Sequence, residues 1–315
     1  MGRNLSKIAV ITPVSHLKGI ISLLMTKGTP FLYEKASKDT IRELLLSHNI
    51  DTIVCNPNQQ TYKIDKELLE NTSVKIINSC STGLNHIDLD YCAENNIEIQ
   101  CHKNDYELIN QLPSTSELAF GLMLSLLRNI PKCNNHVSKY NWDYTRFMGR
   151  QIKDLKVGII GYGRLGKIMK KYCEAFEAKT FIYDPYVNTH QTSLEQMFQE
   201  CDVISLHVHV TNETKYMINK KLLGLVKKNL YIINTSRGEI VNEVDIVNAL
   251  KYNNHYFGKL AGYATDVIEN EFDDITKSPI IRAMNEGNNI IVTPHIGGMT
   301  IEGQTKAYEW SINKL

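Results

Sequence analysis

The sequence lacks long apolar runs and long runs of one charge. No apolar stretch approaches the roughly 18 residues needed to span a bilayer, and the first residues lack the apolar core of a signal peptide. The 35 basic and 34 acidic side chains are interspersed and leave a formal net charge of +1, so no basic surface for nucleic acid or anionic membrane is indicated. We therefore expect neither a membrane nor a nucleic acid as a partner.

The sequence also lacks cysteines spaced as pairs. The seven cysteines are odd in number, widely scattered and never in a CxxC pair, which argues against a disulfide framework and against a zinc site. We expect reduced, buried thiols, no bound metal and a cytoplasmic location.

The composition is that of a folded globular protein, with 43% hydrophobic and 22% charged residues. Its 315 residues exceed one ordinary core, which leaves two domains or one large α/β unit. Runs rich in Ile and Val alternate with helix-like stretches, at 7–14, 52–55, 74–78 and 97–101 and in six further runs from residue 155 onward. This alternation predicts an α/β fold whose parallel sheets are covered by helices on both faces.

The segment from Ser114 to Asn129 predicts a long buried helix. It begins with residues suited to an N-cap, its body is nearly all apolar, and Pro131 is expected to stop it. Because such a helix needs more cover than its own sheet supplies, we expect it at a domain or subunit interface, with an ordinary core helix as the alternative. Residues 300–315 predict one amphipathic helix that returns toward the first domain.

A glycine motif follows one of the apolar runs. Gly161, Gly163 and Gly166 stand in GxGxxG spacing, directly after a predicted strand and directly before a predicted helix. In this context the first glycine permits a tight turn, the second lets the backbone approach a pyrophosphate, and the third lets helix and strand pack closely. The N–H groups at the helix start would then face the phosphates, so a dinucleotide site is predicted.

Asp184 closes the next predicted strand. A carboxylate there would accept hydrogen bonds from the ribose hydroxyls and repel the extra phosphate of NADP, so NAD is favoured. The structural alternatives are a sharp loop without a ligand for the glycines and a turn residue before Pro185 for Asp184.

Three later segments, 234–238, 266–271 and 293–298, place polar residues directly after apolar runs. The functional groups of open α/β sheets gather at the carboxyl ends of the strands, so these segments are candidates for a second part of the site.

With these segments the chain resembles the D-isomer-specific 2-hydroxyacid dehydrogenases, over essentially its whole length. The motifs that carry the resemblance are STGLNHIDLD from Ser81, GYGRLG, DVISLHV with Thr211, NTSRGEIVNE, TDVIENE and TPHIGG. The resemblance implies two doubly wound parallel-sheet domains with the active site in the cleft between them. A flavodoxin-like substrate domain would comprise 1–104 and 290–315, and an inserted NAD-binding Rossmann domain would comprise 105–289.

The resemblance also implies three catalytic residues. Arg237 matches the arginine that grips the substrate carboxylate, for which a planar, bidentate guanidinium is suited. His295 matches the acid/base that exchanges a proton with the substrate oxygen, and Glu271 matches its carboxylate partner. The implied reaction is hydride transfer between nicotinamide and a small 2-hydroxy or 2-oxo acid. Taken alone, each residue has an ordinary alternative: a surface ion pair, a core histidine and a solvated glutamate.

Further residues are implied to bind the cofactor and the substrate. For the cofactor they are Gly161, Gly163, Arg164, Leu165, Gly166, Asp184, His207, Thr235, Ser236, Arg237, Asp266, His295, Gly297 and Gly298; for the substrate they are Ser81, Thr82, Gly83, Leu84 and Arg237. Asp266 is implied to face the nicotinamide, and the 81–84 loop is implied to hold the substrate carboxylate by its N–H groups, although a plain strand-to-helix turn is the alternative. For His207 a structural role at a strand end is equally open.

Some positions depart from the family's habit. His209 and Phe272 stand where proline is usual, Asn242 stands where aspartate is usual, and the connection 251–260 is longer than common. None of these removes a catalytic group, but they leave the subfamily open. The segment 55–63 lacks the arginine that binds phosphate in some phosphoglycerate enzymes, although Lys63 could substitute. Its Asn and Gln residues favour a small polar substrate, with 3-phosphoglycerate and hydroxypyruvate types both left open.

A homodimer through the 114–129 helix is expected from the resemblance and from the helix's apolar faces. The alternative function from a different class is an NAD-sensing, corepressor-like interaction protein without turnover, because such a protein can retain all three catalytic residues. Among enzymes, a formate or phosphonate dehydrogenase is a further alternative. Turnover of a 2-oxo acid would separate the three.

Overall fold

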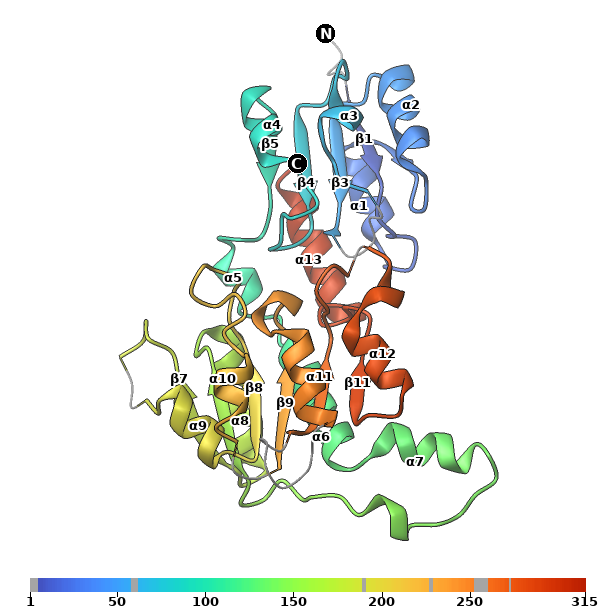
Figure 1. Cartoon of the computed structure of the whole chain (residues 1–315). Helices are drawn as coiled ribbons and strands as arrows, with labels where there is room; N and C mark the ends of the chain where they lie inside the picture. The colour runs from blue at the N-terminus through green and yellow to red at the C-terminus, as the bar shows by residue number, and fades with distance from the viewer. Residues whose placement is uncertain (1–4, 58–61, 189–190, 227–228, 252–259, 272) are drawn as a thin grey trace. The chain divides into compact units, whose positions relative to one another are not determined.

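The chain divides into two compact units, one inserted in the other. The computed structural model describes residues 5–57, 62–188, 191–226, 229–251, 260–271 and 273–315 (Figure 1). The first unit comprises residues 1–112 and 299–315, and the second comprises 113–298. The boundaries expected from the sequence fall after residues 104 and 289, whereas these units divide after residues 112 and 298.

The first unit is built on a five-stranded parallel sheet in the order β2-β1-β3-β4-β5, which is the order of a flavodoxin-like domain. Its strands are β1 (Ser6–Val10), β2 (Gly28–Leu32), β3 (Thr52–Cys55), β4 (Ile76–Ser79) and β5 (Glu98–Gln100). The sequence did not predict β2, because Gly28 and Pro30 are unusual in strands. As an edge strand β2 pairs only with β1, and an edge tolerates proline.

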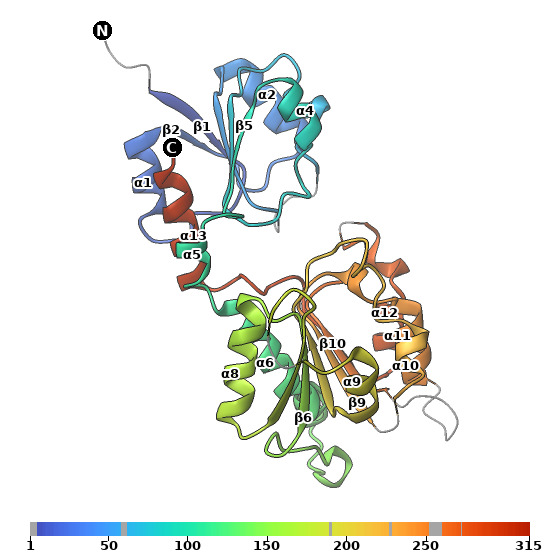
Figure 2. The ribbon, with the colours of Figure 1, turned by 90° about the vertical axis from the view of Figure 1, so that its left-hand side faces the viewer.

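Helices cover both faces of this sheet (Figure 2). They are α1 (Ile20–Lys27), α2 (Lys38–His48), α3 (Lys66–Leu69), α4 (Leu89–Glu94), α5 (Tyr106–Ile109) and α13 (Ile301–Asn313). Alternate residues of β1 point to opposite faces, so Ile8 packs with α1 and α13 while Ala9 packs with α2 and α3. The C-terminal helix α13 thus returns to the first unit, where Ser311 Oγ donates to Asn78 Oδ1 at 2.6 Å.

The second unit is built on a six-stranded parallel sheet in the order β11-β10-β9-β8-β6-β7. Its strands are β6 (Lys156–Ile160), β7 (Lys179–Tyr183), β8 (Val203–Leu206), β9 (Leu230–Asn234), β10 (Leu260–Thr265) and β11 (Ile290–Val292). All six match predicted runs, and the predicted α/β class with two doubly wound domains is confirmed. The strand order reverses between β6 and β8, and such switch points open a crevice at the carboxyl ends of the strands.

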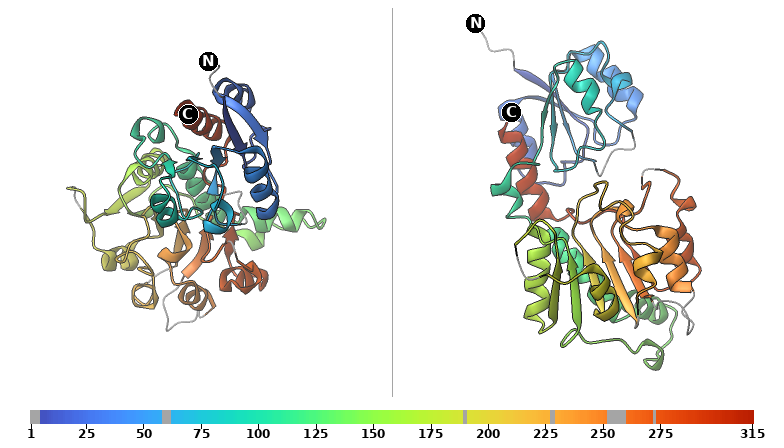
Figure 3. Two further views of the ribbon diagram at one scale, coloured as in Figure 1. Left: turned by 90° about the horizontal axis from the view of Figure 1, so that it is seen from above. Right: turned by 60° about the vertical axis from the view of Figure 1, so that its left-hand side comes forward.

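The helices of the second unit also form two layers (Figure 3). One layer is α6 (Ser114–Leu127) and α8 (Arg164–Ala175); the other is α9 (Leu194–Glu200), α10 (Lys220–Leu223), α11 (Glu243–Lys251) and α12 (Pro279–Asn285). Helix α6 packs on α8 and the sheet, so much of its apolar surface is covered within its own unit.

The ends of α6 differ from the prediction. Its N-cap is Pro113, without a side-chain cap, and the hydroxyl of Ser116 donates instead to the carbonyl of Leu165 at 3.0 Å. The helix ends at Leu127, before the left-handed residue Asn129 (φ 56°), and Pro131 lies in the first turn of the next helix.

That next segment, residues 130–148, extends from the second unit as an arm (Figure 1). It contains α7 (Ile130–Val137), in which no residue is buried, and the 3₁₀ turn η2 (Thr145–Phe147). Its exposed apolar residues are Ile130, Val137, Tyr140, Trp142, Tyr144 and Met148. A cluster of this kind on a protein surface marks an interaction site more often than a solvated one.

None of the seven cysteines forms a disulfide, and five of them are buried. No helix within the described residues is long and apolar enough to cross a membrane.

Candidate functional site

The glycine loop joins β6 to α8 at the point where the strand order reverses. Gly161 adopts φ 90°, and a Cβ there would lie 2.4 Å from the carbonyl oxygen of His207. A Cβ on Gly166 would lie 2.0 Å from the carbonyl oxygen of Gly161, so helix and strand approach too closely for any side chain. Gly163 faces open space and is the N-cap of α8, which has no side-chain cap. The loop therefore offers exposed backbone and the start of a helix to an anionic ligand.

Arg164 and Leu165 form the first turn of α8. The carbonyl of Leu165 accepts the hydroxyl of Ser116, which fastens this turn to α6. Both side chains are partly exposed, so they remain at the surface of the loop where a ligand would lie.

Asp184 lies beside the glycine loop, at the carboxyl end of β7. Its Oδ2 accepts the backbone N–H of Tyr162 at 2.8 Å, and its Oδ1 accepts the N–H of Tyr186 at 3.0 Å. These bonds orient the carboxylate, and each oxygen keeps a second lone pair for a ligand.

Two buried polar atoms at the carboxyl ends of the strands have no hydrogen-bond partner within the described part of the chain. They are Nδ1 of His207, after β8, and Oγ1 of Thr235, after the neighbouring strand β9. His207 is fixed through Nε2 by Ser205 Oγ at 2.8 Å, and burial lowers the pKa of His207 to about 4, so the ring is neutral near pH 7. Orphaned buried polar atoms are rare in native proteins. Together with the glycine cradle they fit a bound dinucleotide, which would supply their partners.

Arg237 is presented by a turn that Asn234 organises. The buried side chain of Asn234 accepts the N–H of Ser236 at 3.0 Å and donates to the carbonyl of Arg237 at 2.9 Å, while Ser236 Oγ donates to Leu206 O at 2.8 Å. The guanidinium of Arg237 donates only to the carbonyl of Ser236, at 2.6 Å, and forms no ion pair with any described residue. A partly exposed cation without a counter-ion can accept an anionic ligand.

His295 and Glu271 form a pair at the neighbouring strand ends. Nδ1 of His295 lies 2.8 and 3.0 Å from the two carboxylate oxygens of Glu271, and the side chains are 26% and 18% exposed. Because a carboxylate only accepts, Nδ1 carries the proton in this contact, and Nε2 is the nitrogen that can exchange a proton with a ligand. This is the arrangement of a general acid/base held by a carboxylate.

Asp266 holds the loop that carries His295. Its Oδ1 accepts the hydroxyl of Thr293 at 2.5 Å and the N–H of Ile296 at 2.8 Å, and its Oδ2 accepts the N–H of Gly297 at 2.7 Å. The carbonyl of Asp266 accepts the N–H of His295 itself, which has φ 53°. Asp266 is only 1% exposed, and burial raises the pKa of its carboxyl. Its observed contacts thus position the histidine loop, including Gly297 of the predicted set.

Asp266→Asn should loosen this loop. An amide offers one acceptor oxygen to three donors, so at least one N–H of the loop loses its partner, at a cost of roughly 1–3 kcal/mol. We expect hydrogen exchange at Ile296 and Gly297 to rise about 10- to 100-fold, as measured by NMR or mass spectrometry. Asp154→Asn, at an exposed left-handed position that favours asparagine, is the control. Unchanged exchange in the Asp266 variant would contradict this role.

The 81–84 loop lies at the carboxyl end of β4 in the first unit. Ser81 Oγ donates to the carbonyl of Gly83 at 2.8 Å, and the carbonyl of Ser81 accepts the N–H of His102 at 2.9 Å. The N–H groups of Thr82, Gly83 and Leu84 meet no acceptor among the described residues. Successive unpaired N–H groups at a strand end form a site for an anion.

Two of the departures from the family lie in described parts of the chain. Asn242 Oδ1 accepts the N–H of Asp245 at 3.1 Å and so begins α11, a role that asparagine and aspartate fill equally well. The His209 side chain is exposed. Phe272 and most of the 251–260 connection lie outside the described residues. Among the residues that the structure describes, no group of three or more His, Cys, Asp or Glu side chains could hold a metal ion.

Comparisons with known families match both units. Residues 120–297 match the family model described as "D-isomer specific 2-hydroxyacid dehydrogenase, NAD binding domain", and residues 16–105 match the catalytic domain of the same family. The two models together cover most of the chain.

Individual relatives agree with these matches. A glyoxylate reductase of Thermococcus litoralis is 32% identical over 78% of this chain and 74% of its own. A D-3-phosphoglycerate dehydrogenase of Bacillus subtilis is 28% identical over 82% of this chain but only 47% of its own, so the chain spans about half the length of this relative. The crystal structure of a D-lactate dehydrogenase from Aquifex aeolicus with NAD and lactic acid is 26% identical, with a TM-score of 0.74 over 98% of this chain and 94% of that one.

Proposed function

Because the chain belongs to the D-isomer specific 2-hydroxyacid dehydrogenases, we propose that it transfers hydride between NAD and a small D-2-hydroxy or 2-oxo acid. The observation that carries the proposal is the His295–Glu271 contact of 2.8 Å at the carboxyl end of the second sheet. Arg237 lies at the same end of that sheet and has no counter-ion among the described residues. The carboxyl ends of the strands in this one sheet thus present an acid/base, a carboxylate-binding cation and a dinucleotide loop.

The chain's own residues divide the chemistry between them. Arg237 binds the substrate carboxylate through two parallel N–H bonds and polarises the adjacent carbonyl. His295, held through Nδ1, gives the Nε2 proton to the substrate oxygen in reduction and takes it back in oxidation. Glu271 stabilises the imidazolium whenever both ring nitrogens carry protons. NADH, when bound, supplies the hydride to the carbonyl carbon.

We propose NADH rather than NADPH as the reductant. Asp184 holds a carboxylate beside the glycine loop, oriented by two backbone N–H groups at 2.8 and 3.0 Å. A negative charge at the end of this strand accepts hydrogen bonds from ribose hydroxyls and repels a 2′-phosphate. The remaining cofactor residues, among them Ser236 and Gly298, lie at the ends of the neighbouring strands.

We also assign the 81–84 loop to substrate binding. The support is the row of N–H groups from Thr82 to Leu84 that meet no acceptor among the described residues. The substrate we propose is a small, unphosphorylated 2-oxo acid. Relatives named glyoxylate reductase and hydroxypyruvate reductase favour this choice, and relatives named D-3-phosphoglycerate dehydrogenase favour the phosphorylated alternative.

The test is NADH oxidation with glyoxylate, hydroxypyruvate, pyruvate and phosphohydroxypyruvate, repeated with NADPH. We expect rapid reduction of one unphosphorylated acid to the D product, with NADPH at least about tenfold less effective, as expected for one unfavourable charge contact. Preference for phosphohydroxypyruvate would contradict the substrate class. NADH binding without turnover of any acid would favour the NAD-sensing interaction protein.

We further propose a homodimer in a reducing compartment such as the cytoplasm. The arm 130–148 exposes Tyr140, Trp142, Tyr144 and Met148, and a second copy of the chain would cover such a surface. The sequence predicts helix α6 alone in the dimer interface, and the proposed interface also includes the arm. Seven cysteines without a disulfide fit a reducing compartment. A monomer by light scattering at micromolar concentration would contradict the dimer.

A further inference from the structure

The position of Glu271 depends on a short turn. Residues 269–271 form this turn, with Asn270 in the left-handed region at φ 57°. The Glu271 carboxylate forms hydrogen bonds with His295 and with no other described residue. Because no other described hydrogen bond orients this side chain, the position of the carboxylate depends on the backbone of the turn.

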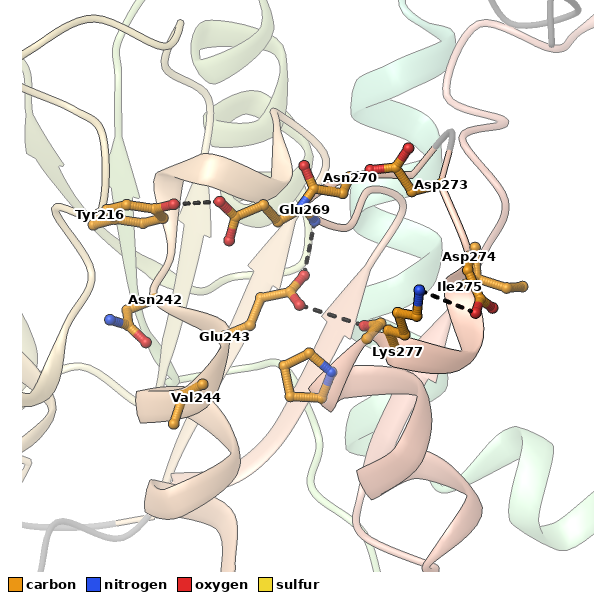
Figure 4. Close-up of a pocket in the computed structure, with 12 residues that line it drawn as sticks. Tyr216, Asn242, Glu243, Val244, Glu269, Asn270, Asp273, Asp274, Ile275 and Lys277 are labelled. Carbon is orange, nitrogen blue, oxygen red and sulfur yellow. Dashed lines mark hydrogen bonds and ion pairs between the residues drawn. The ribbon is translucent and has the colours of Figure 1, made fainter.

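Glu243 forms a hydrogen bond with this turn. It is the first residue of α11, and it is only 5% exposed. Its Oε1 accepts the backbone N–H of Glu269 at 2.9 Å (Figure 4). Its Oε2 accepts the hydroxyl of Ser278 at 3.3 Å. One buried carboxylate therefore fixes both the turn and the start of α12.

Two further contacts hold the same turn. The hydroxyl of Tyr216 donates to the carboxylate of Glu269 (Figure 4). A Cβ on Gly238 would lie 2.2 Å from the nitrogen of Glu269, so the segment after Arg237 packs directly on the turn. Tyr216 is itself tied to that segment, because its N–H donates to the carbonyl of Glu239 at 2.7 Å. The turn that carries Glu271 thus packs against the segment that follows Arg237.

The negative charge of the Glu243 carboxylate is energetically unfavourable at this buried position. Burial, together with the nearby carboxylates of Glu269 and Glu239, raises the pKa of Glu243, which shows that the charged form is disfavoured there. A neutral acceptor would satisfy the same N–H at less cost. Groups that oppose stability in this way are found most often where function requires them.

We propose that Glu243 is a positioning residue, which holds Glu271 against His295 Nδ1 through the backbone N–H of Glu269. Its effect on turnover rests on the proposed dehydrogenase function, whereas its effect on the His295–Glu271 contact does not. Glu271 and Asp266 are charged groups that interact with His295. Only Glu271 should shift when Glu243 is removed, because Asp266 is held by its own loop.

The test compares Glu243→Ala with Glu243→Gln. Alanine removes the acceptor of the Glu269 N–H, and glutamine keeps an acceptor oxygen there. If the turn moves by about 1 Å, kcat falls roughly 100-fold, while KM and the Kd for NADH, measured by fluorescence, stay near the parent values. The alkaline limb of the pH–kcat profile should move to lower pH, as in Glu271→Gln, because the imidazolium loses its carboxylate. Glutamine should restore most of both properties, and Glu195→Ala, at an exposed position of α9, should change neither.

A second readout does not require turnover. The contact of His295 with Glu271 can be followed through the ring resonances of His295 in NMR of histidine-labelled protein, assigned with a His295 variant. We expect these resonances to shift in Glu243→Ala and to return in Glu243→Gln, even if no 2-oxo acid is a substrate. Unchanged resonances in folded Glu243→Ala would overturn the proposal, and so would lower kcat with an unmoved pH profile. If Glu243→Ala does not fold, Tyr216→Phe, which releases the Glu269 side chain, should give a smaller shift in the same direction, and no shift would overturn the proposal.

Discussion

Replacing His295 with asparagine should slow reduction of the 2-oxo acid about 1,000-fold, because the substrate oxygen loses its proton donor. Asparagine is the appropriate substitution here. His295 has φ 53°, a left-handed conformation that asparagine tolerates better than most residues, so the backbone of the loop and its bonds to Asp266 should persist. The measurement is kcat with saturating NADH across the pH range.

Two controls make the His295 result specific. His48→Asn, at an exposed position of the first unit, should behave as the parent does. NADH affinity should change little in His295→Asn, because the glycine loop and Asp184 are untouched. A variant that retains more than about a tenth of parental kcat would contradict the acid/base assignment, and a variant that no longer binds NADH would show that the loop had been disturbed.

Replacing Arg237 with lysine should lower kcat/KM for the 2-oxo acid about 100-fold, and alanine should lower it about 1,000-fold or more. A lysine keeps the charge but cannot form two parallel bonds to a carboxylate, and a charge-assisted hydrogen bond contributes roughly 1.5–3 kcal/mol. Because Arg237 bonds only to its own neighbour's carbonyl among the described residues, little stability should be lost with it. Steady-state kinetics and thermal unfolding of the same preparations check both statements.

Arg150→Lys is the matched control for Arg237. Arg150 pairs with Asp202 at 2.8 Å, and lysine can keep that contact. Equal activity of Arg237→Lys and the parent would mean that the substrate carboxylate is held elsewhere. A loss confined to kcat, with KM unchanged, would indicate that the guanidinium acts only on the reacting carbonyl.

The sequence predicted most of the fold because the central strands of its sheets are largely buried, as β3, β8 and β9 are. In the second sheet each strand is a compact apolar run such as 156–160 or 230–234, and such runs stand out without any partner. The edge strand β2 was missed for the opposite reason. Its residues 28–32 include Pro30, which an edge strand tolerates, and Gly28, where a Cβ would lie 2.2 Å from the carbonyl oxygen of Ser6 on β1.

The sequence predicted the site residues as a set, but it could not show how they are held. Three carboxylate or amide side chains, Asn234, Glu243 and Asp266, fix the turns that carry Arg237, Glu271 and His295. Most of their partners are backbone N–H or carbonyl groups of loops, which every residue possesses and which therefore leave no trace in sequence. The only available signal was a polar residue at or near the end of a buried strand, or at the start of a helix.

The loop that carries His295 ends where the second unit ends, at Gly298. Up to Gly297 the backbone is fastened to Asp266, whereas a Cβ on Gly298 would meet nothing within 4 Å. The alignment of His295 is therefore fixed by contacts within the second unit. A side chain at position 298 would meet no steric clash, and its effect would be confined to the backbone freedom that glycine provides.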